Sequence, residues 1–110
     1  MAGWYELNKS KDGQFRFVLK AGNGEIILTS ELYRSLSSAK KGIASVQKNS
    51  GNDKRFVQKT SSNGKPYFNL RAGNHQVIGT SEMYSSESAC ANGIASVKSN
   101  GSSQTVKDLI

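Results

Sequence analysis

The stretch Gly42-Ile43-Ala44-Ser45-Val46 decides the fold, because the same five residues return at positions 93–97, 51 residues later. Shifting the chain by 51 positions aligns residues 12–49 with residues 63–100 without a gap, and 19 of those 38 positions are identical. A repeat of this length indicates that one supersecondary unit occurs twice in the chain. Each half has only about 50 residues, near the size at which a hydrophobic core becomes marginal. We therefore expect one domain over residues 1–110 in which repeat 1 (1–51) and repeat 2 (52–110) share a core.

Hydrophobic alternation predicts three short strands in each repeat. In repeat 1 the expected strands are residues 5–9, 15–20 and 25–29, separated by turns at Asp12-Gly13 and at Ala21-Gly22-Asn23-Gly24. The same pattern recurs in repeat 2, at residues 55–59, 66–71 and 76–80. Short strands joined by tight turns are typical of antiparallel meanders.

After the third strand of each repeat the period changes to that of a helix. Ala39, Ile43 and Val46 fall on one stripe, Ser35 or Ser37 can cap the start, and the second helix is expected near residues 87–99. The fold class is therefore α+β: two tandem pseudo-symmetric β-β-β-α units that share an antiparallel sheet, with both helices on one face. Residues 104–107 are a candidate for a short last strand. The expected core is Phe17, Leu19, Ile27, Ile43, Val46, Phe68, Leu70, Ile78, Ile94 and Val97.

These motifs together resemble a known family. The paired Asp-Gly and Asn-Gly turns, the repeated Ala-Gly-Asn turn, the Thr-Ser-Glu-x-Tyr segments and the Gly-Ile-Ala-Ser-Val helices are similar to those of the YegP-like family of small bacterial proteins. The resemblance covers nearly the whole chain. It implies the repeated fold and a single chain that corresponds to a dimer of one-unit relatives. It implies no activity and assigns no site residues.

Composition and charge exclude several classes of protein. The formal net charge is +7 with a pI near 9.7, which favours anionic partners or serves solubility alone. No stretch approaches the roughly 20 apolar residues of a membrane span, and the N-terminal residues show no secretory signal. One cysteine, Cys90, excludes an internal disulfide framework. We therefore expect a cytoplasmic protein without a membrane partner.

Candidate catalytic residues are few. His75 is the only histidine, on an expected turn, and a metal site needs several convergent ligands. Cys90 falls on the buried stripe of the second helix, where a small apolar thiol is expected. The repeated Glu31 and Glu82 are expected to serve the strand–helix connection, because acid–base catalysis needs carboxylates in unlike environments. The sequence predicts no enzyme, no cofactor and no metal.

The face of the sheet opposite the helices carries the most suggestive pattern. If the phenylalanines and leucines of the strands point toward the helices, five cationic side chains and one tyrosine point away from them. Such a face could bind a phosphate backbone and stack a base. Polar residues also solvate an open sheet face without any ligand. The six residues are Arg16, Lys20, Arg55, Lys59, Tyr67 and Arg71.

The functional prediction is therefore a small non-enzymatic interaction or accessory module, whose partner is an unidentified protein or nucleic acid. The alternative is weak, non-specific nucleic-acid binding through the basic face. We expect a monomer, because the internal duplication places on one chain the contact that a one-unit relative makes with a second chain.

Overall fold

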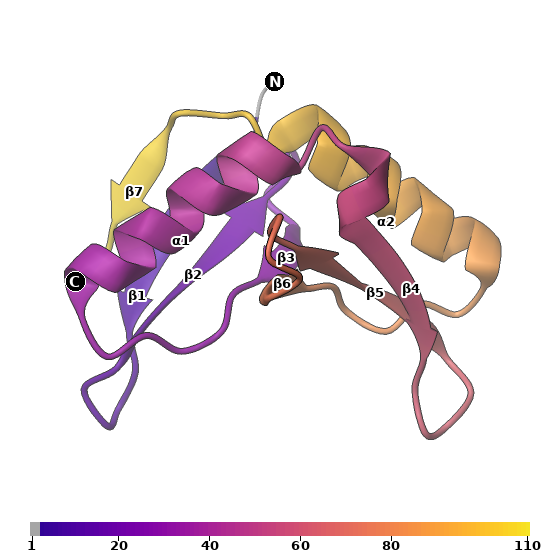
Figure 1. Cartoon of the computed structure of the whole chain (residues 1–110), viewed down its shortest axis with the longest axis horizontal. Coiled ribbons are helices and arrows are strands. Elements are labelled where there is room, and N and C mark those ends of the chain that lie inside the picture. Colours follow the sequence, from indigo (N-terminus) through magenta and orange to yellow (C-terminus); the bar gives the residue numbers. More distant parts are fainter. Residues whose placement is uncertain (1–2) are drawn as a thin grey trace.

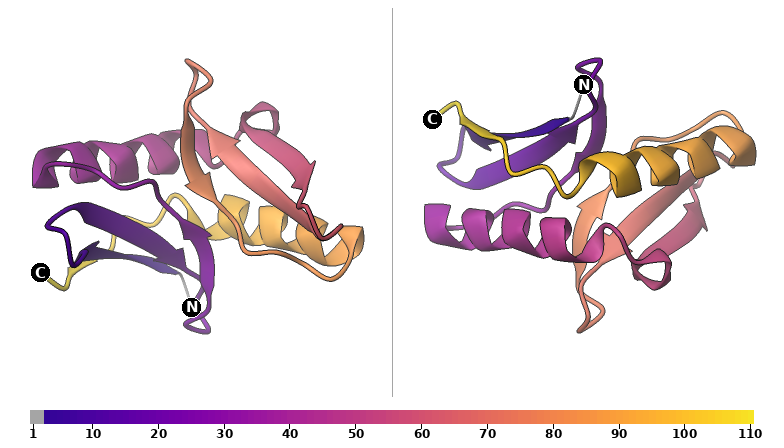
Figure 2. Two further views of the ribbon diagram at one scale, coloured as in Figure 1. Left: turned by 90° about the horizontal axis from the view of Figure 1, so that it is seen from below. Right: turned by 90° about the horizontal axis from the view of Figure 1, so that it is seen from above.

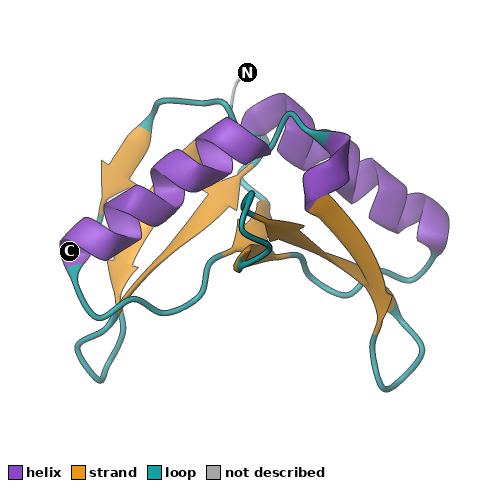
Figure 3. Cartoon of the chain, in the orientation of Figure 1, coloured by secondary structure: helices purple, strands orange, loops and turns teal. Residues whose placement is uncertain are grey.

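Each half of the chain forms three strands followed by an α-helix, and the second half ends with one further short strand (Figures 1 and 3). The structure is a computed structural model that describes residues 3–110. The first half contains β1 (Trp4–Lys9), β2 (Phe15–Lys20), β3 (Ile26–Thr29) and α1 (Leu36–Asn49). The second contains a short 3-10 helix, η1 (Asp53–Arg55), and then β4 (Phe56–Thr60), β5 (Pro66–Arg71), β6 (Val77–Thr80), α2 (Glu87–Asn100) and β7 (Val106–Asp108). The observed bounds lie within about two residues of the expected ranges.

All seven strands belong to one mixed sheet, in the order β4-β5-β6-β3-β2-β1-β7. Neighbouring strands are antiparallel except for β7, which runs parallel to β1. The expectation of a purely antiparallel sheet is therefore wrong at this edge. The reason is that α2 ends beside the start of β1, where the Tyr5 hydroxyl donates a 2.6 Å hydrogen bond to the Gly101 carbonyl. From that point the chain continues into β7, which runs beside β1 in the same direction.

Both helices cover the same face of the sheet. Figure 1 shows them above the strands, while the β1–β2 and β4–β5 turns project below at opposite ends. The views from below and above in Figure 2 show the two faces of this arrangement, one formed by strands and the other by helices. Each helix crosses between halves: α1 contacts β2, β5 and β6, and α2 contacts β2, β3 and β5.

The core lies between the helices and the sheet. Nine of the ten expected core residues are buried there, joined by Tyr5, Leu7 and Leu28 from the strands. Ile94 is the exception, because it stays half-buried at the margin of the core while its counterpart Ile43 is only 4% exposed.

Turns and connections follow local chemistry. Gly13, Gly24 and Gly64 have φ angles between 82° and 85°, as their hairpin turns require. His75 takes the position of Gly24 in the second half with φ 70°, so a side-chain-bearing residue adopts the left-handed conformation there.

The Thr-Ser-Glu segments after β3 and β6 are held by their serines. The Ser30 hydroxyl accepts a hydrogen bond from the Phe17 amide at 2.9 Å, and the Ser81 hydroxyl accepts one from the Phe68 amide at 3.0 Å. Both serines are buried, whereas Glu31 and Glu82 are exposed. The structural role expected of the glutamates therefore belongs to the neighbouring serines.

Candidate functional site

The candidate site is the sheet face turned away from the helices, which we call the outer face. Since Tyr5, Phe17 and Phe68 are buried against the helices, their strand neighbours point to the opposite side. The outer face carries six cationic side chains and one carboxylate, with an aromatic residue in each half. These residues are Trp4, Glu6, Arg16, Lys20, Arg55, Lys59, Tyr67, Arg71 and Lys107.

In the first half, Glu6 organises the charges. It accepts a 2.8 Å hydrogen bond from the Trp4 indole nitrogen and forms a 3.2 Å ion pair with Lys20. Lys107 of β7 lies over the Trp4 ring, with its Nζ 4.3 Å from the ring centroid. The Trp4 hydrogen bond, together with nearby Lys20 and Lys107, lowers the pKa of the Glu6 carboxyl below its usual value. The cations in this half are therefore partly neutralised by protein groups.

In the second half the corresponding positions hold no carboxylate. Arg55 and Val57 stand where the first half has Trp4 and Glu6, and Arg71 stands where it has Lys20. The β4–β5 pairing, continued by one residue from Phe56 and Leu70, places Arg55 opposite Arg71. The Nε atoms of both arginines are buried without a hydrogen-bond partner, and neither forms an ion pair among residues 3–110. This pair is an uncompensated positive charge on the outer face.

Further along the same two strands, Lys59 lies directly opposite Tyr67. Lys59 is exposed and Tyr67 is half-buried, so the ring and the ammonium group both border solvent. Asn69 of β5 is buried between these residues, and it accepts a 3.0 Å hydrogen bond from the Thr80 hydroxyl of β6. Three of the six cationic side chains lie at β4 and β5, and the one carboxylate of the list, Glu6, lies on β1 in the other half.

The structure gathers four of the six expected residues and separates the other two. Arg55, Lys59, Tyr67 and Arg71 share two neighbouring strands, whereas Arg16 and Lys20 lie on β2, with β6 and β3 between. Sequence reasoning missed Trp4, Glu6 and Lys107. Because neighbouring strand residues point to opposite faces, the expected burial of Tyr5 indicates that Trp4 lies on the outer face. No local pattern indicates where β7 pairs with the sheet.

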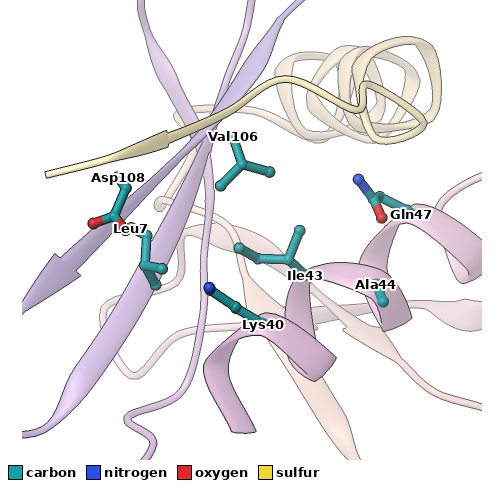
Figure 4. A pocket seen from close by; sticks show the side chains of 7 residues that line it. All are labelled: Leu7, Lys40, Ile43, Ala44, Gln47, Val106 and Asp108. Carbon is teal, nitrogen blue, oxygen red and sulfur yellow. The ribbon is translucent and has the colours of Figure 1, made fainter. Parts of the chain in front are cut away.

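Two of the hollows formed by residues 3–110 lie on the helix side. The larger, about 370 Å³, lies between α1 and the β1–β7 pair (Figure 4). Its lining is mainly apolar, with Lys40 and Asp108 contributing charge. The second, about 200 Å³, lies between the segment leading into β3 and α2. The second hollow is lined in part by Glu25, Glu82 and Tyr84, and burial together with the two carboxylates raises the pKa of the Tyr84 phenol above its usual value.

The cysteine and the histidine lie on different elements. Cys90 is fully buried in α2, and burial raises the pKa of its thiol above the usual value. His75 is exposed on the β5–β6 turn. Within residues 3–110 no three His, Cys, Asp or Glu side chains gather as metal ligands, and no helix is both long and apolar enough to cross a bilayer.

The fold and its repeat place the chain in a class of small α+β proteins. A domain of unknown function, DUF1508, matches twice, over residues 10–56 and 61–108. The chain belongs to the UPF0339 family: it is 68% identical to the UPF0339 protein YegP of Escherichia coli over 98% of both chains. It is also 65% identical to a UPF0339 protein of Acinetobacter baylyi, over 99% of this chain and 98% of that one. The YegP-like resemblance is thereby confirmed.

Two solved structures share the fold. The solution NMR structure of E. coli YegP, described as a protein of unknown function, aligns with a TM-score of 0.94 at 67% identity, covering 99% of this chain and 94% of that one. The solution NMR structure of the Shewanella oneidensis UPF0339 protein aligns with a TM-score of 0.93 at 61% identity, covering 99% and 92%. The family establishes the fold, and no function is established for these relatives.

Proposed function

We propose that this protein is a small non-enzymatic binding module whose working surface is the outer face. The observation that carries the proposal is the excess of positive charge on the outer face. It has six cationic side chains and one carboxylate, Glu6, which already binds Trp4 and Lys20. A face that only needed solvation would be served by mixed charge or by neutral polar groups.

The ligand that fits this surface is a polyanion, and we propose nucleic acid bound without sequence specificity. Arg55, Lys59 and Arg71 supply charge for phosphates, and Tyr67 supplies a ring on which a base can stack. The contacts involve charge and stacking rather than base edges, so affinity should be weak and steeply dependent on salt. Arg16 and Lys20 extend the surface across β2 in this proposal.

We also propose that the two halves are pseudo-symmetric and that the chain acts as a cytoplasmic monomer. Supporting this, equivalent residues meet at the centre: Thr29 pairs with Thr80, and a side chain at Gly101 would collide with Ser50. Each of these pairs is 51 residues apart, as a two-fold relation between the repeats requires. The contact that would otherwise join two chains is then internal.

The test of nucleic-acid binding is fluorescence anisotropy with labelled single- and double-stranded oligonucleotides over a range of salt concentrations. With four or five phosphates neutralised, the log–log slope on duplex DNA should be roughly −4. Changing Arg55, Lys59 and Arg71 together to glutamine should reduce the magnitude of that slope by about 2.7, at about 0.9 per contact.

The matched control removes three exposed lysines from α1 by changing Lys40, Lys41 and Lys48 to glutamine. This variant has the same net charge as the outer-face variant, but its changes lie on the helix side. It should keep most of the slope. Equal losses in the two variants would indicate a non-specific effect of net charge, and no binding at low salt would remove the nucleic-acid proposal.

A further inference from the structure

The two edges of the sheet end differently. Beside β1, the outer edge is filled by β7, with Tyr5 opposite Val106 and Leu7 opposite Asp108. The Tyr5 amide donates to the Thr105 carbonyl and the Leu109 amide donates to the Leu7 carbonyl, both at 2.9 Å. Tyr5 and Leu7 therefore direct their backbone groups toward β7.

The edge at β4 is the equivalent edge of the second half, and no strand of the described chain lies beside it. Phe56 and Gln58 occupy the positions of Tyr5 and Leu7, 51 residues on, so their backbone groups point to the open side. The Phe56 amide donates a hydrogen bond to the Asp53 carbonyl of η1. The Phe56 carbonyl and both backbone groups of Gln58 remain available to an incoming strand.

The helix side of this open edge lacks the cover that β7 provides in the first half. There, Val106 and Ile43 line the same hollow (Figure 4), and Ile43 is only 4% exposed. The counterpart Ile94 is half-buried, and its helix neighbours Ala91 and Ala95 are exposed. An apolar side chain placed as Val106 is placed would cover Ile94.

The outer side of the open edge is more positive than the corresponding part of the first half, because Trp4 and Glu6 are replaced by Arg55 and Val57. Lys107 of β7 lies opposite Glu6 and stacks on Trp4. In the second half those two positions are Val57 and Arg55, with Arg71 beside them and both arginine Nε atoms lacking partners. A strand docked here would face positive charge, so the residue corresponding to Lys107 should be a carboxylate.

We propose that the open edge of β4 binds an extended segment of a partner protein, parallel to β4, in the position that β7 occupies beside β1. The segment presents an apolar residue toward Ile94 on α2 and a carboxylate toward Arg55 and Arg71 on the outer face. Backbone hydrogen bonds to Phe56 and Gln58 supply the affinity, and the two side chains supply the specificity. This goes beyond nucleic-acid binding, because it uses the strand edge and the helix side in addition to Arg55 and Arg71.

The probe is a synthetic peptide with the sequence of residues 103–110 carrying Lys107→Glu, compared with the unchanged peptide. Titration of the ¹⁵N-labelled full-length protein is followed by NMR. The glutamate peptide should shift the amides of Phe56–Thr60 and Ile94, and it should bind about tenfold more tightly than the lysine peptide, since an opposite-charge pair replaces a like-charge one. Amide hydrogen exchange at Gln58 should slow on binding, whereas Leu7 should be slow already.

A paired set of variants tests the edge itself. Gln58→Pro removes an amide that points away from β5, so the sheet is kept while peptide binding should fall at least tenfold. Gln58→Thr keeps the amide and should bind normally. Resonances of β1–β3 report whether the Gln58→Pro protein is folded, and its affinity for oligonucleotides should be unchanged.

Three results would overturn the proposal: no shifts at millimolar peptide, shifts confined to β1 and β7, or equal affinity of the Gln58→Pro and Gln58→Thr proteins. Sedimentation in which the free protein associates through this edge, and loses that association with Gln58→Pro, would assign the edge to a second copy of the chain and overturn the partner segment.

Discussion

Gly42 and Gly93 stand in the middle of the two helices, where glycine costs about 1 kcal/mol relative to alanine. The structure supplies the reason. A Cβ on Gly42 would lie 2.7 Å from Cζ of Tyr33, and one on Gly93 would lie 2.5 Å from Cζ of Tyr84. Each tyrosine ring stacks on a buried phenylalanine, with centroid distances of 6.2 and 6.3 Å, so it cannot move aside freely.

We therefore expect Gly93→Ala to lower the free energy of unfolding by up to about 2 kcal/mol, because a clash of about 1–3 kcal/mol is offset by a gain of about 1 kcal/mol in helix propensity. Urea denaturation measures the change. Gly51→Ala is the matched control, since a Cβ there meets nothing within 4 Å, and its effect should stay within about 0.5 kcal/mol. A Gly93→Ala protein as stable as the control would contradict the packing role of the glycine.

Tyr5 links the first strand to the end of the last helix. Its side chain is buried, its hydroxyl donates to the Gly101 carbonyl at 2.6 Å, and burial raises the pKa of the phenol well above its usual value. The unfolded chain loses this proton near its ordinary pKa of about 10, while the folded chain keeps it. The stabilisation is complete below that pH and is lost as the pH rises above it.

Tyr5→Phe should therefore have two effects. At pH 7 it should lower stability by about 1–2 kcal/mol, because the Gly101 carbonyl loses its buried donor. Above about pH 10 the variant should lose stability less steeply than the original protein, because one ionisation that favours unfolding is gone. Denaturation curves from pH 7 to pH 11 compare the two slopes, and identical slopes would contradict the role of Tyr5.

At the scale of elements, the pairing of β3 with β6 joins the two halves. Leu28 and Gly79 are 51 residues apart, and at Gly79 a Cβ would lie 2.6 Å from Cγ of Leu28. The two repeats therefore differ at this position, because two leucine side chains would collide there. One leucine fills the space that two cannot share.

Gly79→Leu should destabilise the protein by about 3 kcal/mol through overpacking. Leu28→Gly should cost a similar amount by opening a cavity. The double variant, Leu28→Gly with Gly79→Leu, restores one leucine and one glycine on opposite strands and should recover most of the loss. A double-mutant cycle from urea denaturation measures the coupling, and simple additivity would contradict the shared space.

At the scale of the whole molecule, neither half encloses its own core. In the first half, α1 also contacts β5 and β6, while β2 and β3 contact α2, and β7 covers β1. A fragment of residues 1–51 would expose all of these surfaces.

We expect this fragment to unfold or to dimerise, whereas the complete chain should sediment as a monomer of 11.9 kDa at micromolar concentration. Circular dichroism and analytical ultracentrifugation of the two proteins measure this. A folded monomeric fragment would show that one repeat is sufficient. A mass near twice that of the chain for the full-length protein would contradict the internal pairing of the repeats.

The sequence by itself determined the elements and the internal repeat. Strand alternation, the Asp12-Gly13 turn and the 39/43/46 helical stripe are local patterns, and each lies where the structure places the corresponding element. The 51-residue echo then predicted that two halves share a core, because it shows the same half-buried unit twice. Burial of Cys90 followed from its position on the stripe.

Only the tertiary structure decided which edge of the sheet β7 joins and which charged side chains remain without a partner. The parallel pairing of β7 with β1 brings together residues about 100 positions apart, and no local pattern encodes that contact. This pairing places Lys107 over Trp4 and leaves β4 uncovered. The lack of a partner for the Nε atoms of Arg55 and Arg71 was also decided by the tertiary structure. The sequence shows that these residues are charged, but whether a charge is compensated depends on neighbours that are brought together by folding.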